Sequence, residues 1–302
     1  MTLTLSLLLG VLLDRLFGEL PRWHPLVGFG HCASLLENHL NTGHARILRG
    51  ALGWLLLVVP PALAALWLGS VVPVWIVNGI ALYFALGARA LHEHGIKVAE
   101  ALARSDLPEA RLRTSYMVSR DTTQMSEEQA ARATIESVLE NGNDAIFGAI
   151  FWCLLAGAPG VILFRLANTL DAMWGYRNAR FNAFGRIAAR ADDVLNYLPA
   201  RLTALAYALC GKTRQALACW RTQAHAWSSP NAGPVMAAGA GSLGLQLGGA
   251  AVYDGELEAR PLLGIGQPPA AADIGRTLTL VLHSLILWLA VIVSGDVFVH
   301  TL

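Results

Sequence analysis

Residues 51–88 read ALGWLLLVVPPALAALWLGSVVPVWIVNGIALYFALGA and contain no charged side chain. Arg49 and Arg89 flank this run. As a helix it would be about 60 Å long, which is enough for two crossings of a bilayer core of about 30 Å. Over the whole chain 55% of residues are apolar and 14% are charged, against roughly 25% charged in a typical soluble domain. These values favour a membrane protein over the alternative, a soluble all-α protein with a large core.

Gly69 and Pro73 lie near the middle of the run, where they favour a break. We therefore predict a transmembrane hairpin with helices near 52–69 and 73–90. A further span is predicted near 277–295, which is again free of Asp, Glu, Lys and Arg.

Three other apolar stretches, near 145–164, 202–211 and 235–250, are predicted as broken or re-entrant helices. Gly157 and Pro159 interrupt the first of them. If that stretch crossed the membrane once, the polar segments before and after it would lie on opposite faces. A re-entrant hairpin or a buried pair of helices would keep them on one face, as a shared site requires.

Basic residues near the predicted spans indicate the topology. Arg46, Arg49, Arg89 and Lys97 all lie at the ends of the hairpin, and its central turn has none. The positive-inside rule therefore places the polar arms in the cytoplasm. We predict one all-α, multi-pass integral membrane domain over 1–302, with cytoplasmic helical and loop regions forming the site. The net charge of +1 gives no case for nucleic-acid binding.

A first group of candidate acidic and amide residues lies between residues 119 and 144. Ser126 and Gln129 fit a capping box that begins a helix. Glu136 and Glu140 follow Arg132 at spacings of four, which describes either a surface ion-pair stripe or a carboxylate face directed at a metal–nucleotide site. Gly142 fits a helix C-terminus.

A second group of oxygen-bearing side chains follows Asp144. Asn168 and Asp171 are three residues apart and share a helix face, and Asp192 and Asp193 form another acidic pair. Such oxygens suit Mg²⁺ bound together with phosphate, and nearby arginines suit phosphate or carboxylate groups. Structural ion pairs have the same appearance, so this pattern alone leaves both readings open. The glycine-rich 239–244 segment lacks the strand–helix context of a dinucleotide site.

Seven segments in order carry a resemblance to a known family. They are Leu13-Asp14 with Gly18 and His24-Pro25; Ser119 to Thr122; Ala133 to Ser137 with Glu140-Asn141; Asn168 to Asp171 with Gly175-Tyr176; Asp192-Asp193 with Pro199 to Arg201; Ser229 to Gly233; and Leu247 to Gly249 through Tyr253 with Gly255-Glu256 and Arg260-Pro261. Together they resemble the CbiB/CobD family of cobalamin biosynthesis, adenosylcobinamide-phosphate synthase.

The resemblance implies a ligase-type enzyme of vitamin B12 biosynthesis. Such an enzyme would join adenosylcobyric acid, a corrinoid, to (R)-1-aminopropan-2-ol or its O-phosphate, giving adenosylcobinamide or its phosphate. Mg-ATP would drive amide formation through an acyl phosphate, because a carboxylate is a poor electrophile. A carboxylate near the amine would remove its proton.

The resemblance and the residue chemistry together give a set of candidate site residues. The candidate catalytic carboxylates are Glu136, Glu140, Asp144 and Asp171. The candidate substrate- or phosphate-binding residues are His24, Arg120, Asp121, Thr122, Asn141, Asn168, Thr169, Tyr176, Arg177, Arg201 and Asn231. The candidate Mg²⁺ ligands are Asp192 and Asp193.

The implied location is the bacterial cytoplasmic (inner) membrane, with the site facing the cytoplasm. The lipid bilayer and other late membrane enzymes of the pathway are the expected partners. Asn143, Ala145, Ala149 and Ala172 depart from the pattern of many family members, although each motif keeps its aspartate, Asp144 or Asp171. Two alternatives remain: a non-catalytic membrane sensor on the same scaffold, and a transporter. The roles of individual carboxylates and the choice of amine stay open.

Overall fold

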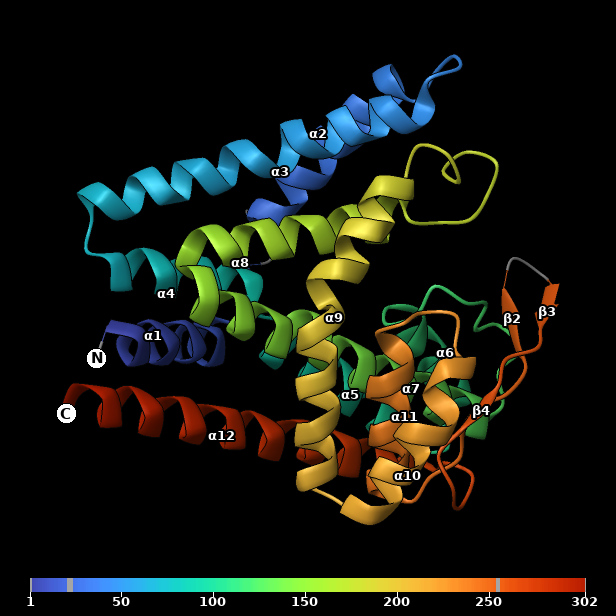
Figure 1. Ribbon diagram of the computed structural model, residues 1–302. Coiled ribbons are helices and arrows are strands. Elements are labelled where there is room, and N and C mark those ends of the chain that lie inside the picture. Colours follow the sequence, from blue (N-terminus) through green and yellow to red (C-terminus); the bar gives the residue numbers. More distant parts are fainter. Residues whose placement is uncertain (1, 21–23, 254–255, 302) are drawn as a thin grey trace. The chain divides into compact units, whose positions relative to one another are not determined.

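The computed structural model describes residues 2–20, 24–253 and 256–301 (Figure 1). Gly255 of the family segments lies outside the described residues. The described chain is predominantly helical and has only short strands, which confirms the prediction of an all-α protein. It divides into two compact units, unit 1 (1–88, 144–196 and 292–302) and unit 2 (89–143 and 197–291). The prediction of a single domain is not tested by this division.

Unit 1 is built from apolar helices that pack side by side. α1 packs against α4, and α8 packs against both α3 and α4. Its core is formed by buried residues such as Leu170, Trp174 and Phe184. The helices are α1 (Thr2–Phe17), α2 (Pro25–Leu40), α3 (Arg46–Val71), α4 (Val74–Ala85) and α8 (Gly148–Trp174).

The predicted hairpin is present as α3 and α4, with the break at Val72 and Pro73. The prediction that the second helix reaches residue 90 is wrong. α4 ends at Ala85, because Leu86 is extended, and the N–H of Gly87 donates to the carbonyl oxygen of Ala145 over 3.1 Å. A new helix, α5 (Ala88–Ala103), begins directly afterwards.

α8 is interrupted where the sequence predicts a break. Gly157 has φ 60° and ψ −149°, a conformation that glycine adopts at no steric cost. Pro159 has no N–H to donate, and the free N–H of Ala158 donates to the Asn78 side-chain oxygen over 2.7 Å. The two arms of α8 form a V in Figure 1. The chain thus has the break of a re-entrant hairpin, while its depth in a membrane stays a prediction.

The preceding α-helix ends at Gly142 as predicted, but the chain stays helical beyond it. α7 (Glu127–Gly142) continues through a π-helical turn, η1 (Asn143–Phe147), directly into α8. The Tyr207 hydroxyl donates to the carbonyl oxygen of Leu139 over 3.1 Å, where a regular α-helix would use the N–H of residue 143. A Cβ at position 142 would lie 2.2 Å from that hydroxyl. Gly142 therefore allows close approach of Tyr207, and a π-helical turn follows it instead of a break in the chain.

The other elements of unit 2 pack around the helices α7 and α11. α7 begins with the predicted capping box: Ser126 Oγ accepts from the N–H of Gln129 over 3.2 Å, and Gln129 Oε1 accepts from the N–H of Ser126 over 2.8 Å. α11 is buried along its whole length and packs against α7 and α10. The helices are α5, α6 (Leu107–Ser115), α7, α10 (Thr213–Gln223), η2 (Ala224–Ala226) and α11 (Ala232–Leu243).

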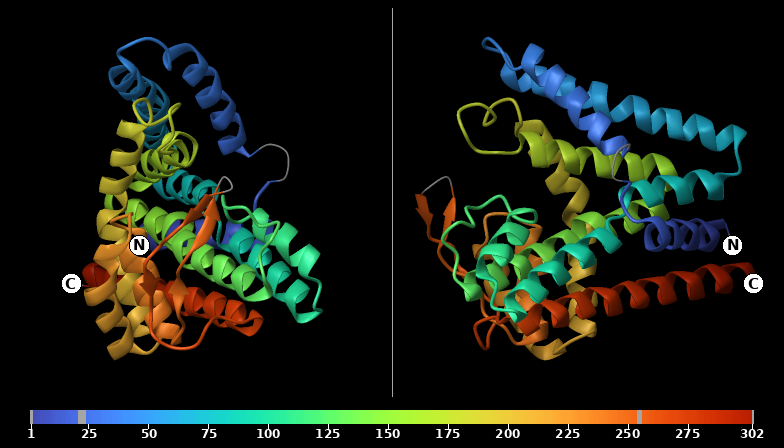
Figure 2. Two further views of the ribbon diagram at one scale, coloured as in Figure 1. Left: turned by 90° about the vertical axis from the view of Figure 1, so that its right-hand side faces the viewer. Right: turned by 180° about the vertical axis from the view of Figure 1, so that it is seen from behind.

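Short strands follow α11, where the sequence predicts broken helix. β1 (Leu247–Gly248) pairs antiparallel with β4 (Leu262–Leu263), and β2 (Ala251–Tyr253) pairs antiparallel with β3 (Glu256–Glu258). The β2–β3 ribbon is visible in both views of Figure 2. α11 ends at Leu243, and its C-cap residue Gly244 has the left-handed conformation with φ 70°.

The helices α9 (Arg186–Leu209) and α12 (Ala271–Thr301) each contain residues of both units. The predicted broken helix at 202–211 is wrong, because α9 continues through Pro199 to Leu209. Proline removes the hydrogen bond to the carbonyl four residues earlier. That carbonyl, on Leu195, instead accepts the indole N–H of Trp152 over 3.1 Å.

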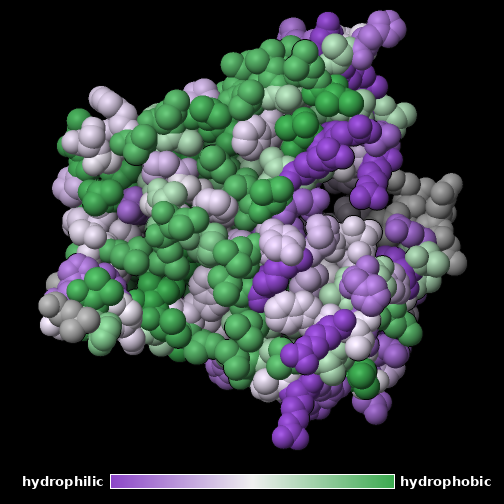
Figure 3. All heavy atoms as spheres, viewed as in Figure 1, coloured by the Kyte–Doolittle hydropathy of each residue, from purple (hydrophilic) through white to green (hydrophobic). Residues whose placement is uncertain are grey.

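Four helical segments of the described chain are long and apolar enough to cross a membrane: 46–71, 74–103, 127–174 and 271–301. The predicted spans near 52–69 and 277–295 fall within them, and the predicted span near 73–90 overlaps the segment 74–103, which contains the break between α4 and α5. On α3, large apolar side chains such as Leu55, Leu63 and Trp67 are exposed. Figure 3 shows apolar atoms covering this part of unit 1. The chain is therefore a membrane protein.

Candidate functional site

Three carboxylates of unit 1 form what we call the acidic cluster: Asp144, Asp171 and Asp192. They come from η1, the last turn of α8 and the first half of α9. Asp192 is 8% exposed. Burial raises the pKa of the Asp192 carboxyl, and the charges of Asp144 and Asp171 raise it further. Asp192 therefore holds a proton at a higher pH than an ordinary aspartate.

Two amide side chains position the Asp192 carboxylate. Asn168 Nδ2 donates to Asp192 Oδ1 over 3.2 Å. Asn196 Nδ2, one turn along α9, donates to both carboxylate oxygens over 3.1 and 3.2 Å. These bonds favour the ionised form and oppose part of the effect of burial. Asn168 is a candidate binding residue, and its bond to Asp192 was not predicted from the sequence; Asn196 lies outside the candidate set.

Arg165 is a charged neighbour of the acidic cluster and is not among the residues predicted from the sequence. Its positive charge interacts with Asp144 and with Glu19. Its Nη1 lies 3.5 Å from Asn168 Oδ1, and its Nε is buried without a hydrogen-bond partner among the described residues. The available signal was its position, directly after the uncharged 145–164 stretch, because a lone arginine beside such a run usually has a function.

A pocket of roughly 390 Å³ lies beside the acidic cluster, where the loop between α8 and α9 meets the start of α9. We call it the loop pocket. It contains three of the predicted residues, Tyr176, Arg177 and Asp193. The pocket is lined by Gly175, Tyr176, Arg177, Phe181, Asn182, Gly185, Arg186, Ala189, Arg190 and Asp193.

Asp192 and Asp193, predicted as a pair of Mg²⁺ ligands, have different surroundings. Asp192 is hydrogen-bonded to the two amides, whereas Asp193 lines the loop pocket. Burial raises the pKa of Asp193, and the positive charge of Arg177 lowers it. In the part of the chain that the structure describes, no three His, Cys, Asp or Glu side chains are arranged to hold one metal ion. Carboxylate oxygens of this kind nevertheless fit Mg²⁺ that is shared with substrate phosphates, since that ion needs one or two of them.

The loop that forms the pocket is fixed to α2 by an ion pair between the exposed Arg180 and the buried Glu37. Arg180 donates to Glu37 through Nη2 (2.5 Å) and Nε (3.1 Å), and Asn41 Nδ2 donates to Glu37 Oε1 over 2.6 Å. The hydrogen bond from Arg180 is the main reason why the pKa of Glu37 is lowered. Arg46 also donates to the carbonyl oxygens of Ala179 and Arg180. The loop therefore has a defined conformation.

In unit 2 the candidate catalytic residue Glu136 is buried between two arginines. Its Oε2 accepts from Arg120 Nη2 over 2.7 Å and from Arg260 Nη1 over 3.1 Å, and its Oε1 accepts from the N–H of Gly248 over 2.8 Å. Both oxygens are thus engaged. This environment fits an anchor for β1 and the two arginines better than a general base, and Glu136 is not part of the predicted surface stripe.

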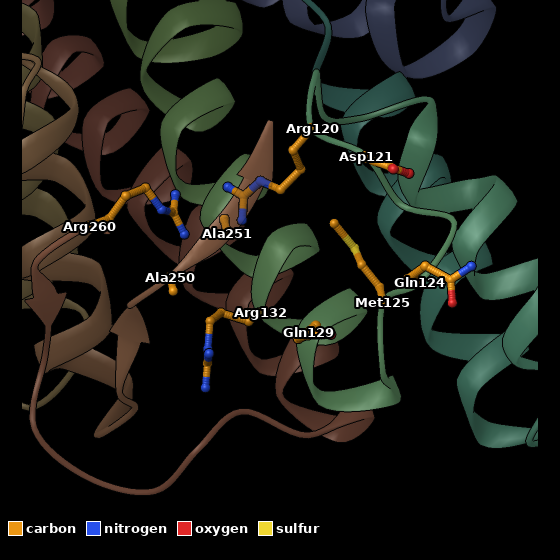
Figure 4. A pocket seen from close by; sticks show the side chains of 9 residues that line it. All are labelled: Arg120, Asp121, Gln124, Met125, Gln129, Arg132, Ala250, Ala251 and Arg260. Carbon is orange, nitrogen blue, oxygen red and sulfur yellow. The ribbon is translucent and has the colours of Figure 1, made fainter. Parts of the chain in front are cut away.

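A second pocket, of roughly 170 Å³, is formed beside these arginines (Figure 4). The Arg120 and Arg260 guanidinium groups are turned toward one another, whereas the Asp121 carboxylate points to the other side. Asp121 Oδ1 accepts from Thr123 N (2.8 Å) and Oγ1 (2.7 Å), which lowers the pKa of Asp121. The pocket is lined by Arg120, Asp121, Gln124, Met125, Gln129, Arg132, Ala250, Ala251 and Arg260.

Arg201 and Asn231, both candidate binding residues, contact each other in unit 2. Arg201 Nη1 donates to Asn231 Oδ1 over 2.8 Å, and Nη2 donates to the carbonyl oxygen of Pro230 over 3.0 Å. The guanidinium carbon lies 3.5 Å from the centre of the Tyr197 ring. These contacts join α9 to the segment before α11.

Other candidates make local contacts. His24 caps α2, where its Nδ1 accepts from the N–H of Leu26 over 3.3 Å, and burial lowers its pKa. Thr169 Oγ1 donates to the carbonyl oxygen of Arg165 over 2.8 Å, and Asn141 Nδ2 donates to that of Ser137 over 2.9 Å. Thr122 is buried.

The candidate residues thus fall into two groups, one in each unit. Unit 1 contains His24, Asp144, Asn168, Thr169, Asp171, Tyr176, Arg177, Asp192 and Asp193. Unit 2 contains Arg120, Asp121, Thr122, Glu136, Glu140, Asn141, Arg201 and Asn231.

Comparison with known proteins relates these groups to a family. The model of a family described as CobD/Cbib protein matches residues 7–281. The chain belongs to the CobD/CbiB family. It is 58% identical to the cobalamin biosynthesis protein CobD of Stutzerimonas stutzeri over 98% of each chain. It is 52% identical to that of Chromobacterium violaceum, over 99% of this chain and 98% of the relative. No solved structure matches.

This membership confirms the resemblance and gives the chain a role in cobalamin biosynthesis. A CobD relative from Geobacter metallireducens is 39% identical over 89% of each chain. The similarity to relatives in several bacteria extends over nearly the full length, so the acidic cluster and both pockets lie in matched sequence.

Proposed function

We propose that the chain catalyses ATP-dependent formation of an amide bond in cobalamin biosynthesis. The acid would be the propionate carboxylate of adenosylcobyric acid, and the amine would be (R)-1-aminopropan-2-ol or its O-phosphate. The product is adenosylcobinamide or its phosphate. The observation that carries the proposal is the acidic cluster, in which Asp192 has a raised pKa beside a pocket lined by arginines.

In the proposed reaction the substrate carboxylate attacks the terminal phosphorus of ATP, and ADP leaves. The amine nitrogen then attacks the acyl carbon of the acyl phosphate, and inorganic phosphate leaves. Arginines stabilise the negative charge on the transferred phosphoryl group. The amine must lose a proton, and a carboxylate with a raised pKa is suited to accept it. Asp171 and Asp144 contribute the negative charge that attracts the ammonium form of the amine.

Mg²⁺ would supply charge neutralisation at the phosphates. Asp193 is the residue best suited to contact it, because its carboxylate lines the loop pocket among arginines. We place this chemistry on the cytoplasmic side of the inner membrane, in keeping with the basic residues at the ends of the hairpin.

The proposal is tested with the full chain in membrane vesicles. Adenosylcobyric acid, Mg-ATP and either amine are supplied, and mass spectrometry of the corrinoid identifies the product. We expect amide formation that depends on ATP, and we expect Asp171→Asn to abolish it while membrane insertion is unchanged. Asp106→Asn is the matched control, since Asp106 is an exposed helix cap distant in sequence from the cluster. Product formed at an equal rate without a nucleotide, or by Asp171→Asn, would contradict the proposal.

Orientation is tested separately by labelling. Single cysteines placed at 121 and at 193 in a cysteine-free chain should react with an impermeant thiol reagent from the same face of sealed vesicles. Reaction from opposite faces would reject a common cytoplasmic site.

A further inference from the structure

The loop pocket of unit 1 presents three arginines without a described ion-pair partner. Arg177 lies in the loop, and Arg186 and Arg190 lie one turn apart at the start of α9. All three are exposed. By contrast, the neighbouring Arg180 is paired with the buried Glu37. Apart from the electrostatic interaction between Arg177 and Asp193, the described chain leaves this positive charge available, and such charge suits phosphate oxygens.

The loop pocket also has a defined shape, because the loop that forms it is held by close contacts at both ends. A Cβ at Gly175 would lie 2.0 Å from Asp171 Oδ1, and a Cβ at Gly185 would lie 1.7 Å from the carbonyl oxygen of Trp174. Between these glycines the Asn178 side-chain oxygen accepts from the N–H groups of Arg180 and Phe181 over 3.1 and 3.0 Å. With the Arg180–Glu37 pair, these contacts hold the arginines on a defined frame, which lowers the entropic cost of binding a ligand.

Three features favour a nucleotide polyphosphate over a single lipid phosphate. The volume of roughly 390 Å³ falls within the usual range of small-molecule sites, about 300–1,000 Å³. The Asp193 carboxylate in the same pocket would repel a lone phosphate, but it can share a divalent cation with a polyphosphate. Tyr176 is 50% exposed at the pocket and offers an aromatic face to a planar base.

We propose that Arg177, Arg186 and Arg190 bind the polyphosphate of the nucleotide, with Asp193 beside its metal ion and Tyr176 beside its base. This assignment rests on the function proposed above. It adds Arg186 and Arg190 to the site and places the phosphates next to Asp171, because Gly175 of the pocket contacts the Asp171 carboxylate.

The test measures binding and turnover separately. The full chain is placed in nanodiscs of phosphatidylcholine, and calorimetry follows binding of inorganic tripolyphosphate and of Mg-ATP. We expect Arg186→Gln/Arg190→Gln to raise the Kd of both probes at least tenfold, and Arg186→Lys/Arg190→Lys to recover part of the affinity. Arg214→Gln/Arg221→Gln removes the same charge from α10 and should leave both Kd values unchanged.

A second arm distinguishes the two sources of phosphate. Nanodiscs containing phosphatidylglycerol should leave the affinity for Mg-ATP unchanged. If this lipid instead weakens Mg-ATP binding to the wild type but not to Arg186→Gln/Arg190→Gln, the pocket binds lipid headgroups and the proposal is overturned. Wild-type affinity in the pocket variant would also overturn it.

Turnover separates this inference from the proposed function. If the wild type forms the amide with ATP, the pocket variant should show a raised KM for ATP and an unchanged KM for the amine. An unchanged KM for ATP would refute the pocket assignment while leaving the function intact. Absence of any amide product from the wild type would refute the function, and tripolyphosphate binding would still report on the arginines.

Discussion

The indole N–H of Trp152 on α8 donates to the carbonyl oxygen of Leu195 on α9 over 3.1 Å. Leu195 is four residues before Pro199, so its carbonyl has no N–H partner within the helix. A tryptophan from another helix therefore compensates for the proline, and α9 continues without a break. Because α9 carries Asp192 and Asp193, this contact helps to fix the acidic residues.

Trp152→Phe should lower the free energy of unfolding by about 1–3 kcal/mol, because it leaves a partly buried carbonyl without a donor. Pro199→Ala supplies the missing N–H, so the cost of Trp152→Phe should shrink in that background. Thermal unfolding in detergent of the single and double variants measures the difference. Trp67→Phe, at a position 67% exposed, is the control; equal costs of Trp152→Phe in both backgrounds would be inconsistent with the compensation.

Glu136→Gln should destabilise unit 2 by about 3–5 kcal/mol, because it removes the buried carboxylate that two arginines share. Glu93→Gln removes a partner from the exposed Arg89–Glu93 pair and should cost at most about 1 kcal/mol. Chemical unfolding of the two variants side by side gives the comparison. A loss of activity by Glu136→Gln with unchanged stability would instead favour a direct catalytic role.

The Glu37–Arg180 pair predicts a dependence of stability on pH. The pKa of Glu37 is lower in the folded state than in the unfolded chain, mainly because Arg180 donates a hydrogen bond to its carboxylate. Its contribution is therefore complete above the unfolded pKa, about 4.3, and is lost as the pH falls through the lower folded value. Glu37→Gln should show a flatter decline of melting temperature below about pH 4.3 than the wild type. Glu127→Gln, in the first turn of α7, should retain the wild-type slope; a parallel decline in Glu37→Gln would count against this pair.

Gly157→Ala should destabilise the chain at the bend of α8. An added Cβ would lie 2.8 Å from Asn78 Oδ1, and the residue has a positive φ of 60°. We expect a cost of about 1–3 kcal/mol, measured by thermal unfolding. Gly275→Ala in α12 meets nothing within 4 Å and should stabilise the helix by up to about 1 kcal/mol. Similar effects of both substitutions would mean that the bend does not require glycine.

Arg165 and Asp144 should show energetic coupling. Arg165→Met leaves the negative charge of the acidic cluster less compensated, and Asp144→Asn should recover part of that loss in the double variant. We expect a coupling free energy of about 0.5–3 kcal/mol, which is usual for charged neighbours. Additive effects in the double-mutant cycle would indicate that Arg165 acts on other groups, such as Glu19.

The apolar helices and their breaks could be predicted because they depend on local sequence. Each of these signals determines the structure of nearby residues only: the uncharged run at 51–88, Gly157 beside Pro159, and Ser126 with Gln129. The places where the chain stays helical beyond an expected end have a different cause. Gly142 and Pro199 are normally terminators, but Tyr207 and Trp152, which are distant in sequence, supply the missing hydrogen bonds.

The candidate site was predictable in its residue types but not in its pairings. The sequence predicts Asp171 as a catalytic residue and Asp192 as a Mg²⁺ ligand, and both lie in the acidic cluster. It could not indicate that Glu136 is held by Arg120 and Arg260, because the second arginine is 124 residues away. The sequence alone does not distinguish neighbouring Asp192 from Asp193, whereas successive helical positions face different surroundings.

Gly175 and Gly185 enclose the loop before α9, and each touches atoms of α8 at a distance that excludes even a methyl group. The number of residues between them is consequently fixed by contacts at both ends. An insertion or deletion in this segment would displace one of the two glycines from its contact with α8. Natural variation here should therefore replace side chains and keep the length of the loop constant. Attempts to alter ligand preference by engineering are then best directed at positions 176, 177, 186 and 190.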